Sequence, residues 1–344
     1  MFGLVSYASY IPKTRITTDE IASFWKKDGA EVATSLGVVE KSVAGIDEDA
    51  VTLAIEASSR ALGSISLDPS RIEAIFVGSE SHPYAVNPTS TIVGEFLGVG
   101  NNYFAADLEF ACKAATTGLQ MVGSLIESKR ISYGLVIGSD TAQARPHDIL
   151  EYTSGSASCA FFVGGKTDEI IVHIIDYASF SSDTPDFWRR DGMRYPSHGG
   201  RFTGEPSYYA HVVGASQKLL EKTKYTPSDF DYCVFHMPNG KFPLEVAKRL
   251  GFTAAQMKPS LTVAHIGNPY SASALVGLSA VLDIAKPKER IFFCSYGSGA
   301  GADSFVFETT RNLATFKKAP TISEQMATKR YISYAEYLRQ TKAI

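Results

Sequence analysis

The sequence has few cysteines, no long apolar run and no large excess of charge of one sign. Its four cysteines, in 344 residues, have neither the paired spacing of a zinc site nor the density of a disulfide framework, so we expect reduced thiols. No apolar run approaches the roughly 18 residues that span a bilayer, and the first residues lack the pattern of a signal peptide. These absences predict a cytoplasmic protein that does not enter a membrane.

The charge and hydropathy of the chain also exclude several classes of protein. A formal net charge of -3 gives no general attraction to nucleic acid or to an anionic membrane. Hydrophobic residues make up 44% of the chain and charged residues 20%, which is enough apolar material for one large core or two fused ones. We therefore expect a folded protein whose partners are small molecules or other proteins.

The second half of the chain weakly repeats the first half at an offset of about 158 residues. The segment Leu67 to Ser70 leads into the apolar run Ile75 to Val77, and Tyr225 to Ser228 leads into Cys233 to Phe235. Apolar residues at helical spacing precede both runs. The repeated order is therefore a helix followed by a strand.

A second pair of matching segments extends the repeat. The helical stretch Cys112 to Ile126 matches Ser271 to Ile284, and each leads into an apolar run typical of a buried strand. Short apolar runs that alternate with helices indicate α/β layers with largely parallel strands. We therefore predict an α/β fold with two pseudo-equivalent halves, residues 1–170 and 171–344.

Two segments lie outside the repeat. Residues 176–206 are rich in serine, aspartate, proline, glycine and aromatic residues, which predicts a long ordered loop that serves as a functional cover or as a linker. After Glu308 the chain becomes polar and basic, and the spacing of its tyrosines predicts a terminal helix over Ser323 to Gln340.

Cys112 lies where an apolar segment gives way to a helix rich in small residues. A thiol at a helix start faces unpaired backbone amides and the positive end of the helix dipole, which favour the thiolate that attacks a carbonyl carbon. Cys159, Cys233 and Cys294 lie inside apolar runs typical of strands, so we interpret them as core residues. Cys112 is the candidate nucleophile, with core packing as the alternative.

Polar residues follow corresponding strands of the repeat. His236 follows one strand and Glu80 the other, and strand-end loops are common catalytic positions. A neutral imidazole would bond a reacting carbonyl or move a proton, and partial desolvation would raise the pKa of Glu80 toward neutrality. Asn268 precedes the helix that matches the Cys112 helix, where its amide would donate to an oxyanion or cap the turn. An ordinary loop histidine and an exposed glutamate are the alternatives.

The motifs around these residues resemble the thiolase superfamily and, within it, the archaeal-type hydroxymethylglutaryl-CoA synthases. These motifs are Glu-Ser at Glu80, EFACKA around Cys112, HMPNGKFP from His236 and IGNPYSAS around Asn268. The resemblance covers nearly the whole chain and implies a thiolase-like fold in a layered α-β-α-β-α architecture. The cysteine, histidine and asparagine alone also suit an initiating ketoacyl-carrier-protein synthase, which Glu80 disfavours. A non-catalytic scaffold with the same fold is a third hypothesis.

The resemblance implies a reaction. Acetyl-CoA acylates Cys112, Glu80 removes a methyl proton, and the resulting carbanion equivalent attacks acetoacetyl-CoA held by His236 and Asn268. Water then releases 3-hydroxy-3-methylglutaryl-CoA, a step of the mevalonate pathway of isoprenoid biosynthesis, with no metal or redox cofactor. The resemblance implies substrate contacts at Gly29, Ala30, Thr153, Thr203, Asn268 and Ser298, and CoA phosphate contacts at Arg201 and Lys241.

The same resemblance implies partners. Members of the superfamily associate at least as homodimers, and the archaeal-type enzymes form a complex with acetoacetyl-CoA thiolase through a small bridging protein. We therefore expect CoA thioesters as ligands, a homodimer or higher oligomer, and a complex of this kind.

We predict that brief exposure to acetyl-CoA leaves an acetyl group on Cys112, because covalent catalysis requires the acyl thioester as an intermediate. Mass spectrometry of the intact protein and of its peptides locates the group, with Cys112→Ala as the control. Full turnover by Cys112→Ala would show that the covalent mechanism is wrong.

Overall fold

The computed structural model describes residues 2–141 and 143–343. Its main sheet contains the strands β1 (Gly3–Tyr10), β4 (Ala74–Gly78), β5 (Phe104–Leu108), β6 (Tyr133–Thr141), β7 (Ser156–Gly164), β8 (Val172–Thr184), β11 (Tyr232–Phe235), β12 (Arg290–Gly297) and β13 (Gly299–Thr309). Their order across the sheet is β11-β12-β13-β8-β1-β7-β6-β4-β5.

The strands form two sets with the same internal order. From the centre outward, β8, β13, β12 and β11 of one set correspond to β1, β7, β6 and β4 of the other. In each set the first two neighbouring pairs are antiparallel and the next pair is parallel. The two sets meet only through a short antiparallel contact between β1 and β8. This order agrees with the sequence repeat, while the boundary at residues 170 and 171 stays a prediction.

The expectation of largely parallel strands is wrong. Parallel pairing joins β4 to β5, β4 to β6 and β11 to β12, whereas the other five pairs in the described sheet are antiparallel. Continuous apolar runs report burial on both faces of a strand, and antiparallel strands placed between two helical layers are buried in the same way.

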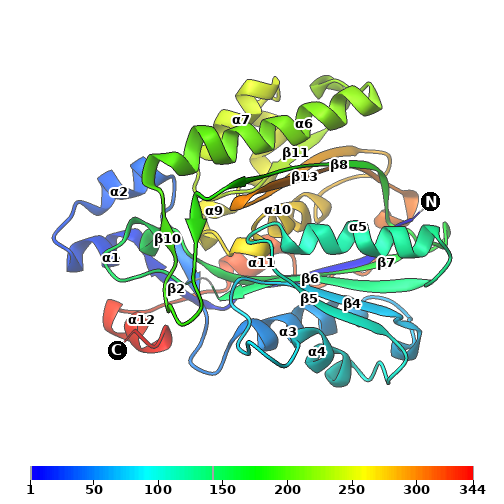
Figure 1. The fold of residues 1–344 in the computed structure, drawn as a ribbon, viewed down its shortest axis with the longest axis horizontal. Helices are drawn as coiled ribbons and strands as arrows, with labels where there is room; N and C mark the ends of the chain where they lie inside the picture. The colour runs from blue at the N-terminus through cyan, green and yellow to red at the C-terminus, as the bar shows by residue number, and fades with distance from the viewer. Residues whose placement is uncertain (1, 142, 344) are drawn as a thin grey trace.

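Helices separate and cover the two sets of strands, which gives five layers (Figure 1). The layer helices are α3 (Ala50–Leu62), α4 (Thr89–Leu97), α5 (Ala114–Glu127), α6 (Ala210–Thr223), α7 (Phe242–Leu250) and α10 (Ser273–Leu282). The helices α3 and α4 cover one set of strands, α6 and α7 cover the other, and α5 and α10 lie between them (Figure 1). The predicted α-β-α-β-α layering is confirmed.

Each interface between layers has its own apolar core. Side chains of α5, α10 and the facing strands form the central cluster, and two further clusters lie beneath α6 and α7 and beneath α3 and α4. The residues of α10 are small or apolar nearly all round and almost all are buried, as expected for a helix covered on every side.

The remaining elements are a small sheet and several short helices. A small sheet contains β2 (Thr14–Thr17), β3 (Glu40–Val43) and β14 (Arg330–Tyr331), and the short helices are α1 (Thr18–Phe24), α2 (Gly29–Leu36), α8 (Ala254–Met257), α9 (Val263–Ile266), α11 (Ile322–Ala327) and α12 (Tyr334–Gln340). No helix in the described ranges has the length and apolar character needed to cross a membrane.

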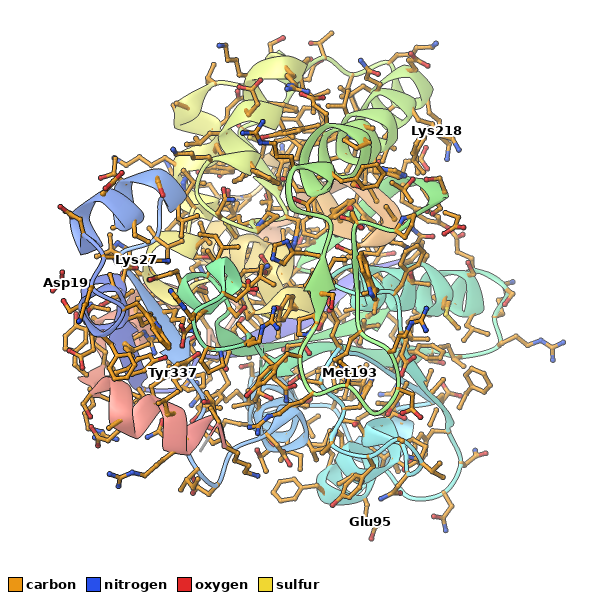
Figure 2. The ribbon with its side chains drawn as sticks, turned by 60° about the vertical axis from the view of Figure 1, so that its left-hand side comes forward. Asp19, Lys27, Glu95, Met193, Lys218 and Tyr337 are labelled. Carbon is orange, nitrogen blue, oxygen red and sulfur yellow. The ribbon has the colours of Figure 1, made fainter. Side chains whose placement is uncertain are left out.

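The segment 176–206 differs from the predicted loop. Strand β8 continues to Thr184 because its backbone pairs with β13 along this stretch, although its outer residues are polar and exposed. A hairpin of β9 (Phe187–Trp188) and β10 (Ser197–His198) follows, with Met193 in the connecting loop (Figure 2). The cover is therefore an extended strand and a hairpin, not an irregular loop.

The C-terminal tail contains two helices instead of the predicted single one. Each begins with its own capping box, Thr321 with Glu324 and Ser333 with Glu336, and β14 lies between them. Ser333 interrupts the predicted helix because its side chain accepts from the Glu336 amide in a new first turn.

A buried lysine joins this tail to the body of the protein. Lys41 in β3 is 2% exposed, and its Nζ donates to the carbonyl oxygen of Glu151 and, at 3.1 Å, to the hydroxyl of Tyr337 in α12. Burial lowers the pKa of Lys41 to about 7 from its ordinary 10.5. Part of the docking of α12 thus depends on a lysine that loses its proton easily.

We predict that Lys41→Met flattens the rise of stability with pH between 7 and 9. In this range the unfolded chain keeps a proton on Lys41 that the folded chain releases, so the wild-type free energy of unfolding increases with pH. Urea unfolding at pH 7, 8 and 9 measures the slope. Substitution of the exposed Lys248 by methionine is the control and should keep the wild-type slope.

Candidate active site

The topology brings the ends of several strands to one edge. Because β4, β5 and β6 are mutually parallel, their carboxyl ends meet, and these ends carry Glu80, Cys112 and Asp140. In the other set, β11 and β12 are parallel, and His236 and Ser298 follow them. Each set of strands therefore supplies part of one site.

A cavity of about 260 Å³ is lined by residues of both halves of the chain. Its lining includes six of the residues expected from the sequence, namely Cys112, Thr153, Thr203, His236, Asn268 and Ser298. Glu80 is outside this lining and borders a smaller neighbouring cavity, which shares Phe187 and Tyr270 with the first.

Cys112 and Glu80 form a direct hydrogen bond. The thiol of Cys112 donates to Oε1 of Glu80 across 2.9 Å, and Cys112 is 7% exposed. Gly78, the last residue of β4, makes this approach feasible, because a Cβ there would lie 2.3 Å from the backbone nitrogen of Ala115. The start of α5 thus lies directly on the end of the strand that leads to Glu80.

The environment of the pair raises the pKa of both groups, so each keeps its proton at a higher pH than it would in water. Burial first, and Asp140 second, raise the pKa of Glu80 to about 8, in the direction predicted. Burial and the Glu80 carboxylate raise the pKa of the Cys112 thiol well above its usual value. The direction of the Cys112 pKa is therefore opposite to the expectation that the helix start favours a thiolate, because burial and the carboxylates of Glu80, Asp140 and Asp186 raise it.

Asp140 holds the loop of Glu80 in place. Its Oδ1 accepts hydrogen bonds from the Glu80 amide at 2.8 Å and from the hydroxyls of Ser79 and Ser81 at 2.8 and 2.6 Å. Its Oδ2 accepts from the amide and hydroxyl of Ser271 at 2.9 and 2.7 Å. Sequence reasoning missed Asp140, although its position at the end of a strand parallel to β4 is a signal for it.

His236 and Asn268 face the cavity from the second half of the chain. His236 is 1% exposed, and burial lowers the pKa of its imidazole to about 3, so the ring is neutral as predicted. Oδ1 of Asn268 accepts from the amide of Tyr270 at 3.0 Å, which directs its side chain and leaves the amino group as a donor. The site thus combines an acid/base carboxyl with two neutral polar groups.

A tyrosine and an aspartate that sequence reasoning missed support the Ser298 loop. Asp186, which precedes the β9–β10 hairpin, accepts from the Tyr296 hydroxyl at 2.6 Å and from the Gly299 amide at 3.0 Å. The Ser298 hydroxyl also donates to it, at 3.3 Å. Only the fold reveals this contact, because Asp186 lies more than a hundred positions away in the sequence.

The other expected contact residues lie outside the cavity lining. Arg201 and Lys241 are exposed, next to segments that contribute to the lining. Gly29 is packed against Asp19 of α1, and Ala30 is exposed at the same end of α2 (Figure 2 marks Asp19). The residue of α2 that lines the cavity is Leu36, at its other end.

Comparison with known proteins agrees with this geometry. A family model described as 3-oxoacyl-[acyl-carrier-protein (ACP)] synthase III C terminal matches residues 220–309. The hydroxymethylglutaryl-CoA synthase of Archaeoglobus fulgidus is 53% identical over 344 residues, with 100% of this chain and 99% of that protein covered. The chain belongs to the hydroxymethylglutaryl-CoA synthase family.

Solved structures confirm the fold. An HMG-CoA synthase complexed with CoA matches with a TM-score of 0.89 and 21% identity, over 98% of this chain and 89% of that one. MvaS in complex with 3-hydroxy-3-methylglutaryl coenzyme A matches with a TM-score of 0.87 and 24% identity, over 99% and 91%. The predicted thiolase-like fold is confirmed.

Family membership decides between the two enzyme hypotheses. The match to the ketoacyl synthase model contains His236 and Asn268 but not Cys112 or Glu80, so it does not include the carboxyl that separates the two hypotheses. The synthase relative matches over the full length of the chain, in agreement with the prediction from Glu80.

We predict that Glu80→Gln lowers the pKa of the Cys112 thiol, because it removes the negative charge nearest to a thiolate. The pH dependence of alkylation by iodoacetamide measures this pKa, with Cys112→Ala to subtract reaction at other sites. Glu95→Gln removes an exposed carboxylate from α4 and is the matched control (Figure 2). An unchanged thiol titration in Glu80→Gln would contradict the electrostatic account.

Proposed function

We propose that this synthase condenses acetyl-CoA with acetoacetyl-CoA through an acetyl thioester on Cys112, and releases 3-hydroxy-3-methylglutaryl-CoA and CoA. The observation that carries the proposal is the 2.9 Å hydrogen bond between Cys112 and Glu80, at a cavity lined by His236 and Asn268. The reaction removes a proton from carbon, and a carboxyl next to the nucleophile is placed to accept it.

The first step is acetyl transfer. The Cys112 thiol gives its proton to Glu80 as the sulfur attacks the thioester carbonyl of acetyl-CoA, and CoA leaves as a thiol after taking that proton. Backbone amides of Cys112 and Ser298 stabilise the negative oxygen that develops on the carbonyl. Glu80 is ionised again at the end of this step.

The second step forms the carbon–carbon bond. Glu80 removes a proton from the methyl group of the acetyl thioester, and the resulting carbanion equivalent attacks the ketone of acetoacetyl-CoA. His236 and Asn268 donate hydrogen bonds to the ketone oxygen, and Glu80 returns its proton to the new alkoxide. A neutral imidazole is suited to this role because it donates a hydrogen bond without carrying a charge.

Hydrolysis completes the cycle. Water attacks the thioester carbonyl, the bond to Cys112 Sγ breaks, and the sulfur takes back a proton to restore the thiol. The steps use groups of the chain, the two thioesters and water, so the proposed mechanism assigns none to a metal or redox cofactor.

Binding of the substrates extends beyond the reacting groups. Thr153 and Thr203 line the cavity and support the acyl chains, and the exposed Arg201 and Lys241 are suited to the phosphates of CoA. Contact of Gly29 and Ala30 with a substrate stays a prediction. A cytoplasmic location, a homodimer and a complex with acetoacetyl-CoA thiolase through a bridging protein are also part of the proposal, supported by the family resemblance.

We predict that purified protein forms 3-hydroxy-3-methylglutaryl-CoA from the two thioesters at a rate that rises with pH through about 8, because condensation needs ionised Glu80. Glu80→Gln should condense about 10²- to 10⁴-fold more slowly. Acetyl-Cys112 should still accumulate in this variant, because its thiol ionises at lower pH.

Chromatography of the CoA esters and mass spectrometry of the protein separate the two steps. A Glu80→Gln variant that condenses at the wild-type rate would contradict the role of Glu80. Transfer of labelled malonyl groups with release of carbon dioxide would instead identify a ketoacyl synthase.

A further inference from the structure

A buried ion pair lies directly beside the nucleophile. Lys113, the residue after Cys112, places its Nζ 2.9 Å from Oδ2 of Asp303 in β13, and the two side chains are 5% and 1% exposed. Removing both charges from water is costly unless the geometry satisfies them fully. Neither residue lines the cavity, so the pair needs an explanation other than contact with substrate.

The pair has further hydrogen-bond partners and joins the two halves of the chain. Lys113 Nζ also donates to the Thr117 hydroxyl at 2.9 Å. Asp303 accepts from the hydroxyls of Thr116 and Ser179 at 2.7 and 2.8 Å. Strand β13 is therefore connected to the first turn of α5, the helix that follows Cys112.

The backbone around Ser298 rests on the segment that carries Cys112. A Cβ added at Gly297 would lie 2.3 Å from the carbonyl oxygen of Phe110 and 2.8 Å from Cγ of Lys113. A Cβ at Gly301 would lie 2.6 Å from the Phe110 ring and 2.9 Å from Cε of Lys113. The aliphatic part of Lys113 is thus enclosed between two glycines on either side of the Ser298 loop.

We propose that the Lys113–Asp303 ion pair is a positioning pair that sets the spacing between Cys112 and the Ser298 loop. The inference rests on the function proposed above, in which these two positions supply the amides that stabilise the thioester oxyanion. Such donors must lie about 2.7–3.1 Å from the developing oxyanion, and here they come from different halves of the chain. The ion pair fixes one half against the other at this point.

The pair acts through geometry instead of through the charge of the thiol. Asp303 neutralises Lys113 at 2.9 Å, and the direction of the Cys112 pKa follows burial and Glu80. Replacing the pair by neutral groups should therefore change the rate of acetyl transfer, while the pKa of the Cys112 thiol should stay raised.

The test uses the double variant Lys113→Met with Asp303→Asn, which removes both charges together and leaves no buried ion unpaired. We expect acetylation of Cys112 at saturating acetyl-CoA to fall about 100-fold, as for an approximately 1 Å misplacement. The acetyl-CoA concentration at half-maximal rate should not change, because neither residue contacts the cavity. A crystal structure of the variant should show the Ser298 loop displaced from Cys112.

Tyr7→Phe is the matched control. It removes another hydrogen bond between the halves, the partly buried one from the Tyr7 hydroxyl to Asp283 at 2.9 Å, away from the cavity. This variant should lose thermal stability and keep the wild-type acetylation rate. Lys113→Arg keeps the charge but lengthens the side chain. If the double variant does not fold, the same acetylation measurement is made on Lys113→Arg.

The outcomes separate the inference from the proposed function. A folded double variant that acetylates Cys112 at the wild-type rate would overturn the positioning role, as would slow acetylation with an undisplaced Ser298 loop. A wild-type protein that forms no acetyl-Cys112 would overturn the proposed function instead. In that case the crystal structure of the double variant still shows whether the Lys113–Asp303 pair positions the Ser298 loop.

Discussion

The carboxylate of Asp140 is the interaction on which the rest of the site depends. It accepts hydrogen bonds from three consecutive residues around Glu80 and from Ser271 at the start of the α10 segment. A buried carboxylate is stable only when its lone pairs are satisfied, so this arrangement permits little movement of Glu80. The fixed loop then holds the Glu80 carboxyl within 2.9 Å of the Cys112 thiol.

Burial gives these groups their chemical character. The same desolvation raises the pKa values of Cys112 and Glu80 and lowers that of His236, so it favours the neutral form of all three groups. The mechanism proposed above needs ionised Glu80 to take the Cys112 proton, so the raised pKa of Glu80 makes that step depend on pH. The protonation state of these groups therefore depends on burial as much as on the identity of the residues.

Two kinds of similarity support different conclusions about this chain. Identity of 53% over the full length shows the family, whereas solved structures at 21–24% identity show the fold alone. The ketoacyl synthase model matches only the C-terminal segment that carries His236 and Asn268. This match therefore leaves out Glu80, the residue that separates the two enzyme hypotheses.

The sequence by itself determined the helix and strand order, the layered α/β class and the candidate residues Glu80, Cys112, His236 and Asn268, because apolar periodicity and strand-end position are local properties. It did not determine strand direction, the course of residues 176–206 or the break in the terminal helix, since these depend on which backbone groups pair in space. Only the tertiary structure showed that Asp140 holds Glu80, that Asp186 supports the Ser298 loop and that burial keeps Cys112 a thiol. Those effects arise from residues distant in sequence and from the loss of solvent, which no local pattern encodes.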